Sequence, residues 1–401
     1  RCNVPHLRFP EFTGEWKKST IGSLSTKVGS GVTPRGGETV YKSEGHSFVR
    51  SQNVGWGHLQ LDDIAFIDKE THLRQKNTEL QLDDVLLNIT GASIGRSALV
   101  NKQIAGGNVN QHVCIIRTKD NLVPAFLCNF LLSNHGQKQI DSFQAGGNRQ
   151  GLNFEQIRSI KITIPSTKEQ TKIATLLHLI DERIATQNKI IEDLKKLKSA
   201  ISKHLFARKD LLETTICLSN IATLKNGYAF QSGKYNALGK WKILTITNVP
   251  GERYINDENC NCIINLPNDI QDHQVLKEGD ILISLTGNVG RVSLCKNGDY
   301  LLNQRVGLLQ LAKNVNREYL YQILSSQRFE NSMIACGQGA AQMNIGKVDV
   351  ESYVLPYSSN GNNILWVAKI LHSYDERIIN ELRRLTLLTM QKQYLLTQMF
   401  I

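Results

Sequence analysis

Apolar residues recur every seven positions from Lys168 to Phe206, in two interleaved series. The first series is Ile173, Ile180, Gln187, Leu194 and Ile201, and the second is Leu177, Ile184, Ile191, Lys198 and Leu205. This spacing predicts one long helix with the apolar seam of a coiled coil, interrupted by two polar residues. With a rise of about 1.5 Å per residue, the helix is a rod of roughly 60 Å, which suits a spacer.

The end of the chain repeats this pattern 194 positions later. The segment Asp181-Glu182-Arg183-Ile184 recurs as Asp375-Glu376-Arg377-Ile378, and even the interruptions recur, as Glu381 and Lys392. The apolar positions of this second seam are Tyr374, Leu388 and Leu395 in one series, and Leu371, Ile378, Leu385 and Met399 in the other. A single heptad run fits a solvated amphipathic helix equally well, whereas two matching seams predict that the helices pair as an antiparallel coiled coil.

Short apolar runs separated by Gly, Asn and Asp fill residues 21–165 and return in residues 211–357, a pattern typical of strands. The two segments share landmarks in one order, namely Asp84 to Gly91 with Asp280 to Gly287, Gly95-Arg96 with Gly290-Arg291, Asn110-Gln111 with Asn303-Gln304, Leu152-Asn153 with Met343-Asn344, and Pro165 with Pro356. This order predicts a tandem repeat.

The predicted fold class is α+β, a tandem repeat of two strand-rich α/β domains separated by two long helices. The predicted boundaries are a lead-in at 1–20, a first domain at 21–165, a central spacer helix at 166–210, a second domain at 211–357 and a C-terminal spacer helix at 358–401. Antiparallel helices would place the two domains at opposite ends of a rod. That geometry suits two half-sites on duplex DNA, with the rod as a ruler.

Charge and cysteine content narrow the class of partner and the compartment. The net charge of +11, with a pI near 9.2, favours a polyanion such as nucleic acid. No run approaches the ~18 apolar residues of a membrane span, and the first residues lack the apolar core of a secretion signal. The eight cysteines include no Cys-x-x-Cys pair, so we expect free thiols and a cytoplasmic protein.

The sequence lacks the catalytic motifs of enzymes that act on nucleic acids and of several hydrolase classes. It has no Pro-Pro pair of the kind an adenine methyltransferase loop needs. Gly233-Lys234 and Gly346-Lys347 are followed by Tyr235 and Val348, so neither is a phosphate-binding loop. His-Glu-x-x-His and Gly-x-Ser-x-Gly are also absent. We therefore expect a chain without a catalytic centre of its own.

The ordered landmarks and the two Asp-Glu-Arg-Ile helices resemble the specificity (S) subunit of type I restriction-modification systems over nearly the whole chain. The resemblance implies two target recognition domains, each reading half of a bipartite asymmetric DNA site, with the helices setting the gap and docking two modification subunits. It implies a non-catalytic subunit of a restriction endonuclease and adenine-N6 methyltransferase complex that acts in phage defence. S-adenosylmethionine would lie on the modification subunits, ATP and Mg on the restriction (translocase/nuclease) subunits, and no cofactor on this chain.

Two other interpretations remain open at this point. The chain could be a structural adaptor whose rod spaces two protein-binding domains without touching DNA. It could also be the specificity subunit of a methyltransferase system that lacks restriction subunits. Salt-sensitive binding to duplex DNA would separate the adaptor from both DNA-reading alternatives.

Base-reading residues are expected where the two copies differ, because shared residues serve the common scaffold. Side chains with paired hydrogen-bonding groups are the best candidates, since Arg reads guanine and Asn or Gln reads adenine in the major groove. The candidates are Arg35, Arg50, Ser51, Gln52, Asn148, Arg149 and Gln150 in the first domain, and Gln231, Lys234, Thr247, Arg253, Gln338 and Gln342 in the second. Each could equally be an exposed polar loop residue, and nearby Lys42 and Lys240 would contact phosphates.

Residues that are identical in the two copies are expected to have structural roles. Gly91 and Gly287 are expected to relieve tight turns. Asn110 and Asn303 could cap turns, while the paired Arg96 and Arg291 could bind either a carboxylate or a phosphate. Apolar residues off the seam are assigned to docking of the modification subunits, with packing onto the globular domains as the alternative: Leu176, Leu197, Phe206, Ile370, Ile379, Leu382 and Phe400.

Overall fold

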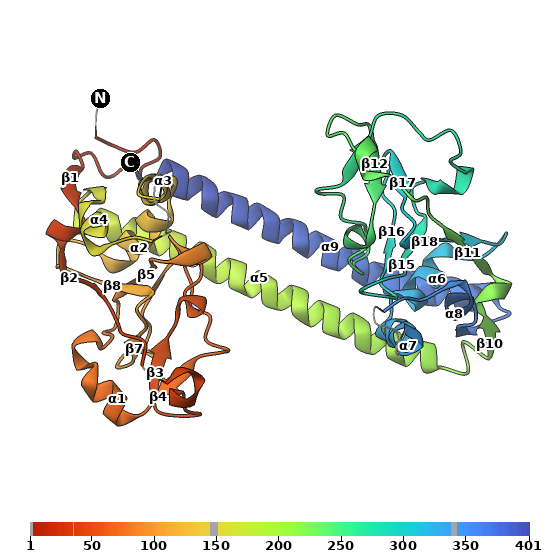
Figure 1. Ribbon diagram of the computed structural model, residues 1–401, viewed down its shortest axis with the longest axis horizontal. Coiled ribbons are helices and arrows are strands. Elements are labelled where there is room, and N and C mark those ends of the chain that lie inside the picture. The colour runs from red at the N-terminus through yellow and green to blue at the C-terminus, as the bar shows by residue number, and fades with distance from the viewer. Residues whose placement is uncertain (1–2, 35, 145–150, 338–342) are drawn as a thin grey trace. The chain divides into compact units, whose positions relative to one another are not determined.

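The structure is a computed structural model that describes residues 3–34, 36–144, 151–337 and 343–401. Its chain divides into two compact units. Unit 1 contains Arg1–Gln187 and Arg384–Ile401, and unit 2 contains Asn188–Arg383. Each unit therefore combines one globular domain with part of each long helix (Figure 1).

The two long helices are α5 (Thr167–Ala207) and α9 (Gly361–Gln398), which confirms the two helices that the heptad patterns predict. In unit 1, Leu177 of α5 and Leu395 of α9 belong to one buried cluster, and in unit 2 Leu205 and Leu371 belong to another. The helices thus share an apolar core in each unit. Their pairing as one continuous antiparallel coiled coil stays a prediction.

Unit 1 contains three sheets, in the orders β2-β8-β5-β6, β4-β3-β7 and β1-β9. Within the first sheet every described pair is antiparallel, whereas β3 and β7 are parallel. The strands are β1 (Lys17–Thr20), β2 (Ser25–Ser30), β3 (His46–Val49), β4 (Ala65–Ile67), β5 (Val85–Asn88), β6 (Ser97–Leu99), β7 (Asn108–Val109), β8 (Val113–Thr118) and β9 (Lys161–Ile164). The short helices are α1 (Lys69–Arg74), α2 (Pro124–Leu132), α3 (Asn134–Ser142) and α4 (Phe154–Ser159).

Unit 2 repeats this architecture with sheets in the orders β11-β18-β15-β16, β13-β12-β17-β14 and β10-β19. Its strands are β10 (Thr214–Cys217), β11 (Ala222–Asn226), β12 (Trp241–Leu244), β13 (Asn261–Ile263), β14 (Val275–Leu276), β15 (Ile281–Ser284), β16 (Val292–Leu294), β17 (Tyr300–Leu302), β18 (Val306–Leu311) and β19 (Val354–Tyr357). Its short helices are α6 (Arg317–Leu324), α7 (Gln327–Gly337) and α8 (Lys347–Glu351). The corresponding strand orders confirm the tandem repeat.

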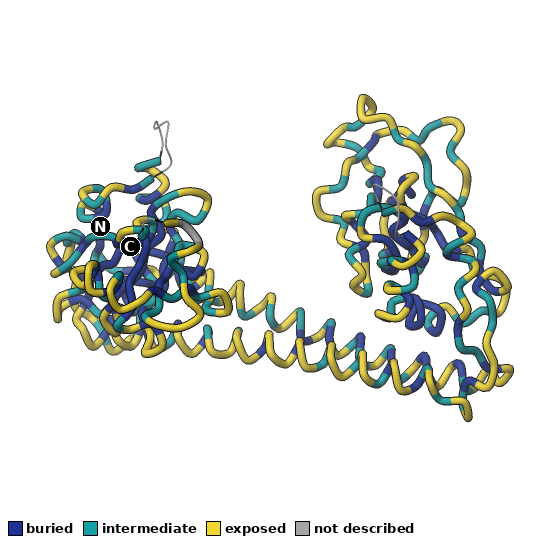
Figure 2. The backbone as a smooth tube through the Cα atoms, turned by 60° about the horizontal axis from the view of Figure 1, so that its bottom comes forward, coloured by how far each residue is buried: buried dark blue, intermediate teal, exposed yellow. Residues whose placement is uncertain are grey.

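The first sheet of each unit is buried on both faces. Along β5, Val85 and Leu87 face the cluster that contains α2 and the long helices, while Leu86 faces the β4-β3-β7 side. This alternation follows from the two-residue period of a strand, and a strand buried on both faces is a near-continuous apolar run, broken here only at its last residue, Asn88. Figure 2 shows the result: buried backbone gathers in the sheets, whereas buried and exposed residues alternate along the long helices.

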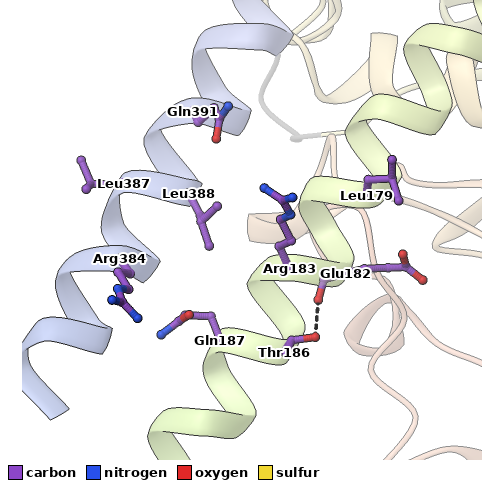
Figure 3. Close-up of a pocket in the computed structure, with 9 residues that line it drawn as sticks. All are labelled: Leu179, Glu182, Arg183, Thr186, Gln187, Arg384, Leu387, Leu388 and Gln391. Atoms are coloured by element: carbon purple, nitrogen blue, oxygen red, sulfur yellow. Dashed lines mark hydrogen bonds between the residues drawn. The ribbon is translucent and has the colours of Figure 1, made fainter. Parts of the chain in front are cut away.

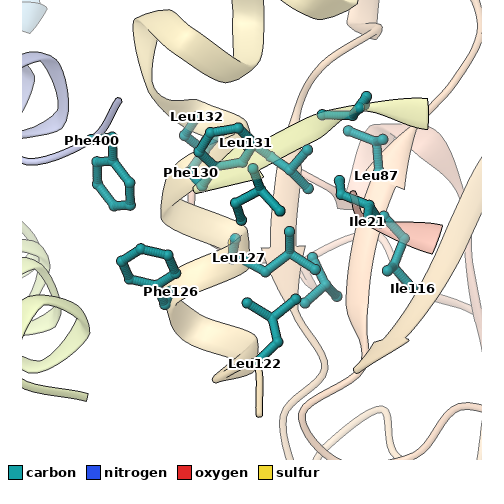
Figure 4. Close-up of a cluster of buried hydrophobic side chains, with 14 of the residues drawn as sticks. Ile21, Leu87, Ile116, Leu122, Phe126, Leu127, Phe130, Leu131, Leu132 and Phe400 are labelled. Atoms are coloured by element: carbon teal, nitrogen blue, oxygen red, sulfur yellow. The ribbon is translucent and has the colours of Figure 1, made fainter. Parts of the chain in front are cut away.

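The end of α9 belongs to the core of the first domain. Phe400 is 1% exposed and its ring lies 5.0 Å from that of Phe126 and 6.3 Å from that of Phe130, both in α2 (Figure 4). Trp16 of the lead-in packs edge-on against Phe126 from another direction, at 5.9 Å. The lead-in is therefore part of the domain, and Leu7 donates a backbone hydrogen bond to Gln398 O at 3.0 Å.

Strand pairing corrects two of the landmarks. The sequence match sets Leu152-Asn153 against Met343-Asn344, but Leu152 N bonds to Ile89 O as Ile345 N bonds to Leu285 O. Asn153 and Gly346 then take the same place, as the N-caps of α4 and α8. Strand β1 corresponds to β10, and Lys17 pairs with Ile164 as Thr214 pairs with Tyr357. Ile164 therefore corresponds to Tyr357, and the match of Pro165 with Pro356 is wrong by the same two residues. Short identities of one or two letters did not determine the register.

Candidate nucleic-acid interface

A three-residue 3-10 turn follows β3 in unit 1 and β12 in unit 2, and it is built in the same way in both. In Ser51–Asn53 the Oδ1 of Asn53 accepts a hydrogen bond from Arg50 N at 2.9 Å. In Ile246–Asn248 the Oδ1 of Asn248 accepts one from Thr245 N at 2.8 Å. Each asparagine also donates from Nδ2 to a backbone oxygen farther along the chain, and both are buried. The shared asparagine therefore fixes the turn.

The middle residue of this turn is exposed in both units and differs between them. It is Gln52 in unit 1 and Thr247 in unit 2. Gln52 donates from Nε2 to Oδ2 of Asp63, and the hydroxyl of Thr247 lies 2.9 Å from that of Thr245. These two predicted residues therefore occupy one structural position, where a variable polar side chain stands on a constant frame.

Arg50 and Ser51 lie beside Gln52 but are held by the domain. Arg50 donates from Nη2 to Asp63 O at 2.7 Å and to Asp63 Oδ2 at 3.2 Å, and its guanidinium stacks over Tyr41 at 5.5 Å. The side chain of Arg50 is 22% exposed. Ser51 O accepts a hydrogen bond from Asn88 Nδ2 at 2.8 Å. Arg50 thus orders the turn, while Gln52 is the residue most open to solvent.

Gln231 is the N-cap of another 3-10 turn, Ser232–Lys234, and Lys234 is its last residue; both are exposed. They line a hollow of about 430 Å³ together with three aromatic side chains, Tyr228, Phe230 and Tyr235. The rings of Tyr228 and Phe230 lie 4.8 Å apart. Sequence reasoning missed these aromatic residues, although their clustering around Gln231 was visible in the sequence.

Arg253 is placed differently from the other candidates. Its side chain is 8% exposed and makes a bidentate ion pair with Glu318 of α6, at 2.8 and 2.7 Å. A further bond joins it to Asp375 Oδ2 of α9 at 2.9 Å. Burial disfavours the charge of Glu318, but hydrogen bonds from Arg253 and Gln322 outweigh it and hold the pKa of Glu318 below its usual range. These contacts favour a structural role for Arg253 over a base contact.

The remaining candidates lie outside the described residues. They are Arg35, Asn148, Arg149, Gln150, Gln338 and Gln342. Of the predicted phosphate contacts, Lys42 and Lys240 are both exposed, and Lys240 lies 3.4 Å from Asp299.

Residues that the two copies share serve the scaffold. Gly91 and Gly287 have φ of +68° and +70°, which confirms their predicted role in tight turns. Asn110 Oδ1 accepts a hydrogen bond from His112 N at 3.0 Å, and Asn303 Oδ1 accepts one from Arg305 N at 3.3 Å, so both cap turns. Arg291 lies 3.5 Å from Glu330, which supports the carboxylate alternative for this residue.

The buried aspartates at the start of β5 and β15 differ in their partners. Asp84 accepts both branches of a bidentate bond from Arg117, each at 2.7 Å. The residue at the place of Arg117 on β18 is Gln310, and burial raises the pKa of Asp280 despite the hydrogen bond that it accepts from Lys277 N. The repeat therefore keeps the carboxylate but not its bidentate arginine, and Arg317 and Lys277 act on Asp280 only by Coulomb attraction.

The predicted docking surface on the long helices needs correction. Phe400 is buried in the core of unit 1 and Leu176 packs against that core, while Phe206 and Ile370 pack against the core of unit 2. For these four residues the alternative, packing onto the globular domain, is right. Leu197 is 46% exposed, and Ile379 and Leu382 are partly exposed.

On the long helices of unit 1, the exposed apolar side chains lie at and beside a groove between α5 and α9. The groove has a volume of about 550 Å³ and is lined by Leu179, Glu182, Arg183, Thr186, Gln187, Arg384, Leu387, Leu388 and Gln391 (Figure 3). Leu179 is 51% exposed and Leu387 is 64% exposed, and Met390 and Tyr394 continue the apolar stripe along α9. Exposed apolar area of this kind marks a surface for another protein.

Two further properties concern the whole described chain. The cysteines within the described ranges are all free thiols, as predicted, and Cys114, Cys128 and Cys295 among them are buried. Across those same ranges, no helix combines the length and the apolar character needed to cross a membrane.

Comparisons with known proteins identify the family. The family model described as "Type I restriction modification DNA specificity domain" matches residues 13–196 and again residues 213–388. The EcoKI specificity subunit of Escherichia coli K12 is 22% identical, over 93% of this chain and 86% of its own length. The putative MjaX specificity subunit of Methanocaldococcus jannaschii is 21% identical, over 88% of this chain and 85% of its own.

A solved structure has the same fold. The S subunit of a type I restriction-modification system from M. genitalium superposes with a TM-score of 0.58 at 17% identity, covering 99% of both chains. Because the family model matches most of the chain, once for each copy of the repeat, this protein belongs to the type I restriction-modification DNA specificity family.

Proposed function

We propose that this chain is the DNA sequence-recognition subunit of a type I restriction-modification complex. One observation carries the proposal: the same asparagine-fixed turn presents Gln52 in one domain and Thr247 in the other. Two domains that read different half-sites need a constant frame with a variable polar tip. Family membership supplies the class of ligand, and the net charge of +11 agrees with a phosphate backbone as partner.

Each domain, at 21–165 and 211–357, reads half of a bipartite asymmetric site in the major groove. Gln52 has the paired donor and acceptor that match adenine, while a threonine offers a hydroxyl and a methyl group. Gln231 and Lys234 border the aromatic hollow and join Thr247 as contacts of the second domain. Arg35, Asn148, Arg149, Gln150, Gln338 and Gln342 remain proposed contacts, Arg50 and Ser51 support Gln52, and Lys42 and Lys240 contact phosphates.

The long helices set the gap between the half-sites and dock two modification subunits. The groove with exposed Leu179 and Leu387 is the proposed docking surface in unit 1, in place of the buried residues predicted first. In this assembly S-adenosylmethionine binds the modification subunits, and ATP with Mg binds the restriction subunits. The chain itself contributes recognition rather than catalysis, and the complex works in the cytoplasm.

The test is to co-express the full chain with its modification subunit and to map methylated adenines across the host genome. We expect a split, asymmetric motif with a fixed gap. Exchange of residues 21–165 for another recognition domain should change one half of the motif and leave the other half intact. A stable complex that methylates nothing, and that binds no duplex at low salt, would contradict the proposal.

A further inference from the structure

The second recognition domain is tied to the long helices through one carboxylate, that of Asp375 in α9. Its Oδ2 accepts hydrogen bonds from Arg253 at 2.9 Å and from Gln322 Nε2 at 2.6 Å, and its Oδ1 lies 2.5 Å from Nζ of Lys198 in α5. Arg253 comes from the loop after the Thr247 turn, and Gln322 comes from α6. One buried group therefore joins two parts of the domain to both helices.

Arg253 anchors this cluster to the domain. Its two terminal nitrogens bind Glu318, and one of them also reaches Asp375, so the guanidinium bridges α6 and α9. The side chains of Arg253 and Asp375 are each 8% exposed. The bidentate pair with Glu318 fixes the guanidinium within the domain, and the further bond to Asp375 connects the oriented guanidinium to α9. A charge left unpaired at this buried place is costly. The geometry of the domain on the helix is thus enforced.

The first domain lacks this anchor. The counterpart of Asp375 is Asp181, which makes an ion pair with Lys392 at 2.5 Å and has a 34% exposed side chain. In α2 the places of Glu318 and Gln322 are taken by Ala125 and Asn129. Asn129 donates to Ala125 O within its own helix.

The loop that corresponds to the Arg253 loop also differs. It has Gly57 facing the helices, where an added Cβ would lie 3.1 Å from Nζ of Lys392. The first domain is held to the helices by the apolar cluster around Phe126, Leu177 and Phe400. Gln170 of α5 adds neutral hydrogen bonds, since its Oε1 accepts from Val123 N at 2.8 Å and its Nε2 donates to Asn121 O at 3.0 Å. The charged anchor onto α9 is thus a feature of the second domain.

We propose that Arg253 is a positioning residue, which fixes the angle of the second recognition domain on the spacer and thereby makes the complex selective for the gap. This inference rests on the proposed function. One base pair more or less in the gap moves a half-site by about 3.4 Å and turns it by roughly a tenth of a helical turn. The second domain resists that displacement, because a shift on the helix would break the bonds of Arg253 and Gln322 to Asp375 and leave the buried carboxylate of Asp375 under-paired.

The test uses the full chain in complex with its modification subunit, after its motif is known. Methylation rates are measured on duplexes with the native gap and with one base pair added or removed. The variants are Arg253→Met, which keeps the bulk and removes the charge, and Asp375→Asn, which weakens the acceptor. Both should leave the two half-site sequences unchanged, while the preference for the native gap falls about tenfold, the scale of one lost charge-assisted contact.

Two controls sharpen the result. Arg253→Lys keeps a charge but not the bidentate geometry, so gap preference should recover in part. Lys242→Met removes an ion pair that stays within the same domain, with Asp257 at 2.8 Å, and should not change gap preference. Should Arg253→Met fail to fold, Asp375→Asn and the milder Gln322→Met still decide the question.

Two outcomes would count against the inference, and a third against the proposed function. An altered base in one half-site at unchanged gap preference would make Arg253 a base-reading residue. An equal loss of methylation at every gap would make the cluster merely stabilising. If the unmodified chain yields no split motif at all, the proposed function fails instead, so the two failures are distinguishable.

Discussion

Nζ of Lys198 in α5 lies 2.5 Å from Oδ1 of Asp375 in α9. The residues 194 positions away, Lys392 and Asp181, make the same contact in unit 1 at 2.5 Å. Each lysine is a polar interruption of an apolar seam, and each aspartate begins the Asp-Glu-Arg-Ile segment. The lysine interruptions of the heptad are therefore ion pairs between the two helices, and the repeat preserves both halves of each pair.

The pair in unit 1 predicts a charge-reversal effect. Asp181→Lys brings two ammonium groups together and should lower the free energy of unfolding by about 2 kcal/mol, between the values for exposed and buried pairs. The double variant Asp181→Lys with Lys392→Asp should recover most of that loss. Urea unfolding of the wild type, of Asp181→Lys, of Lys392→Asp and of the double variant gives the interaction energy directly. Simple additivity of the two single effects would show that the pair contributes nothing.

The exposed turn residues predict separable changes in specificity. Gln52→Thr should relax or change one base in the first half-site, and Thr247→Gln one base in the second, each altering discrimination by about 1–3 kcal/mol. Methylome mapping of cells that express each variant checks this. Gln103→Thr, at an exposed glutamine outside the turn, is the matched control. A motif unchanged by both turn variants would remove Gln52 and Thr247 from the reading set.

The carboxyl of Asp280, which lacks the bidentate arginine of its counterpart Asp84, predicts a pH effect on stability. Because burial raises its pKa on folding, its neutral form is favoured in the folded state. Its contribution to stability is therefore present below the unfolded pKa, near ~3.9, and is lost as the pH rises through the folded value. Asp280→Asn should raise the urea midpoint at pH 7, with a gain that shrinks toward pH 3.5. Asp84→Asn should have the opposite sign at pH 7, since it weakens the pair with Arg117.

Thiol reactivity should follow burial. Burial raises the pKa of Cys114 and Cys295 to about 12 and that of Cys128 to about 11, so these thiols are rarely ionised at neutral pH. Cys336 is exposed. A thiol reagent followed by peptide mapping should modify Cys336 first and the three buried cysteines only in denaturant. Equal rates at all four would contradict the described packing.

The aromatic contact at the end of α9 predicts a difference between the two copies. Phe400→Ala removes a ring that is 1% exposed between Phe126 and Phe130, and it should cost about 3–5 kcal/mol of unfolding free energy. Its counterpart Phe206→Ala, at a partly exposed ring 6.4 Å from Tyr319, should cost less. Denaturant unfolding of each variant measures both effects.

Much of the architecture could be predicted from the sequence because the sequence contains the same pattern twice. Heptads define helices at any position, and a repeat of 194 residues tests each assignment against its copy. Register was less accessible, since the hydrogen bonds of Leu152 and Ile345 are set by partners far away in the sequence. This is why the landmarks near the end of each domain were matched two residues apart.

The candidate site was predictable only in part. Gln52 and Thr247 each precede the same pair of residues, Asn53-Val54 and Asn248-Val249, and a local turn is encoded by adjacent residues. Arg253 looked like any polar loop residue, since its partners Glu318 and Asp375 lie 65 and 122 positions away. Exposed apolar residues on α5 and α9 were likewise misassigned, because a heptad does not tell which off-seam positions the globular domains cover.

The asparagine-fixed turn keeps its constant frame separate from its variable residue. Its frame relies on backbone groups and on Asn53 or Asn248, so a substitution at the exposed middle position costs the fold little. If Gln52 and Thr247 read bases as proposed, substitutions there change the target sequence one base at a time without destabilising the fold. A host population that carries such variants would recognise many different target sequences in an invading genome with one protein architecture.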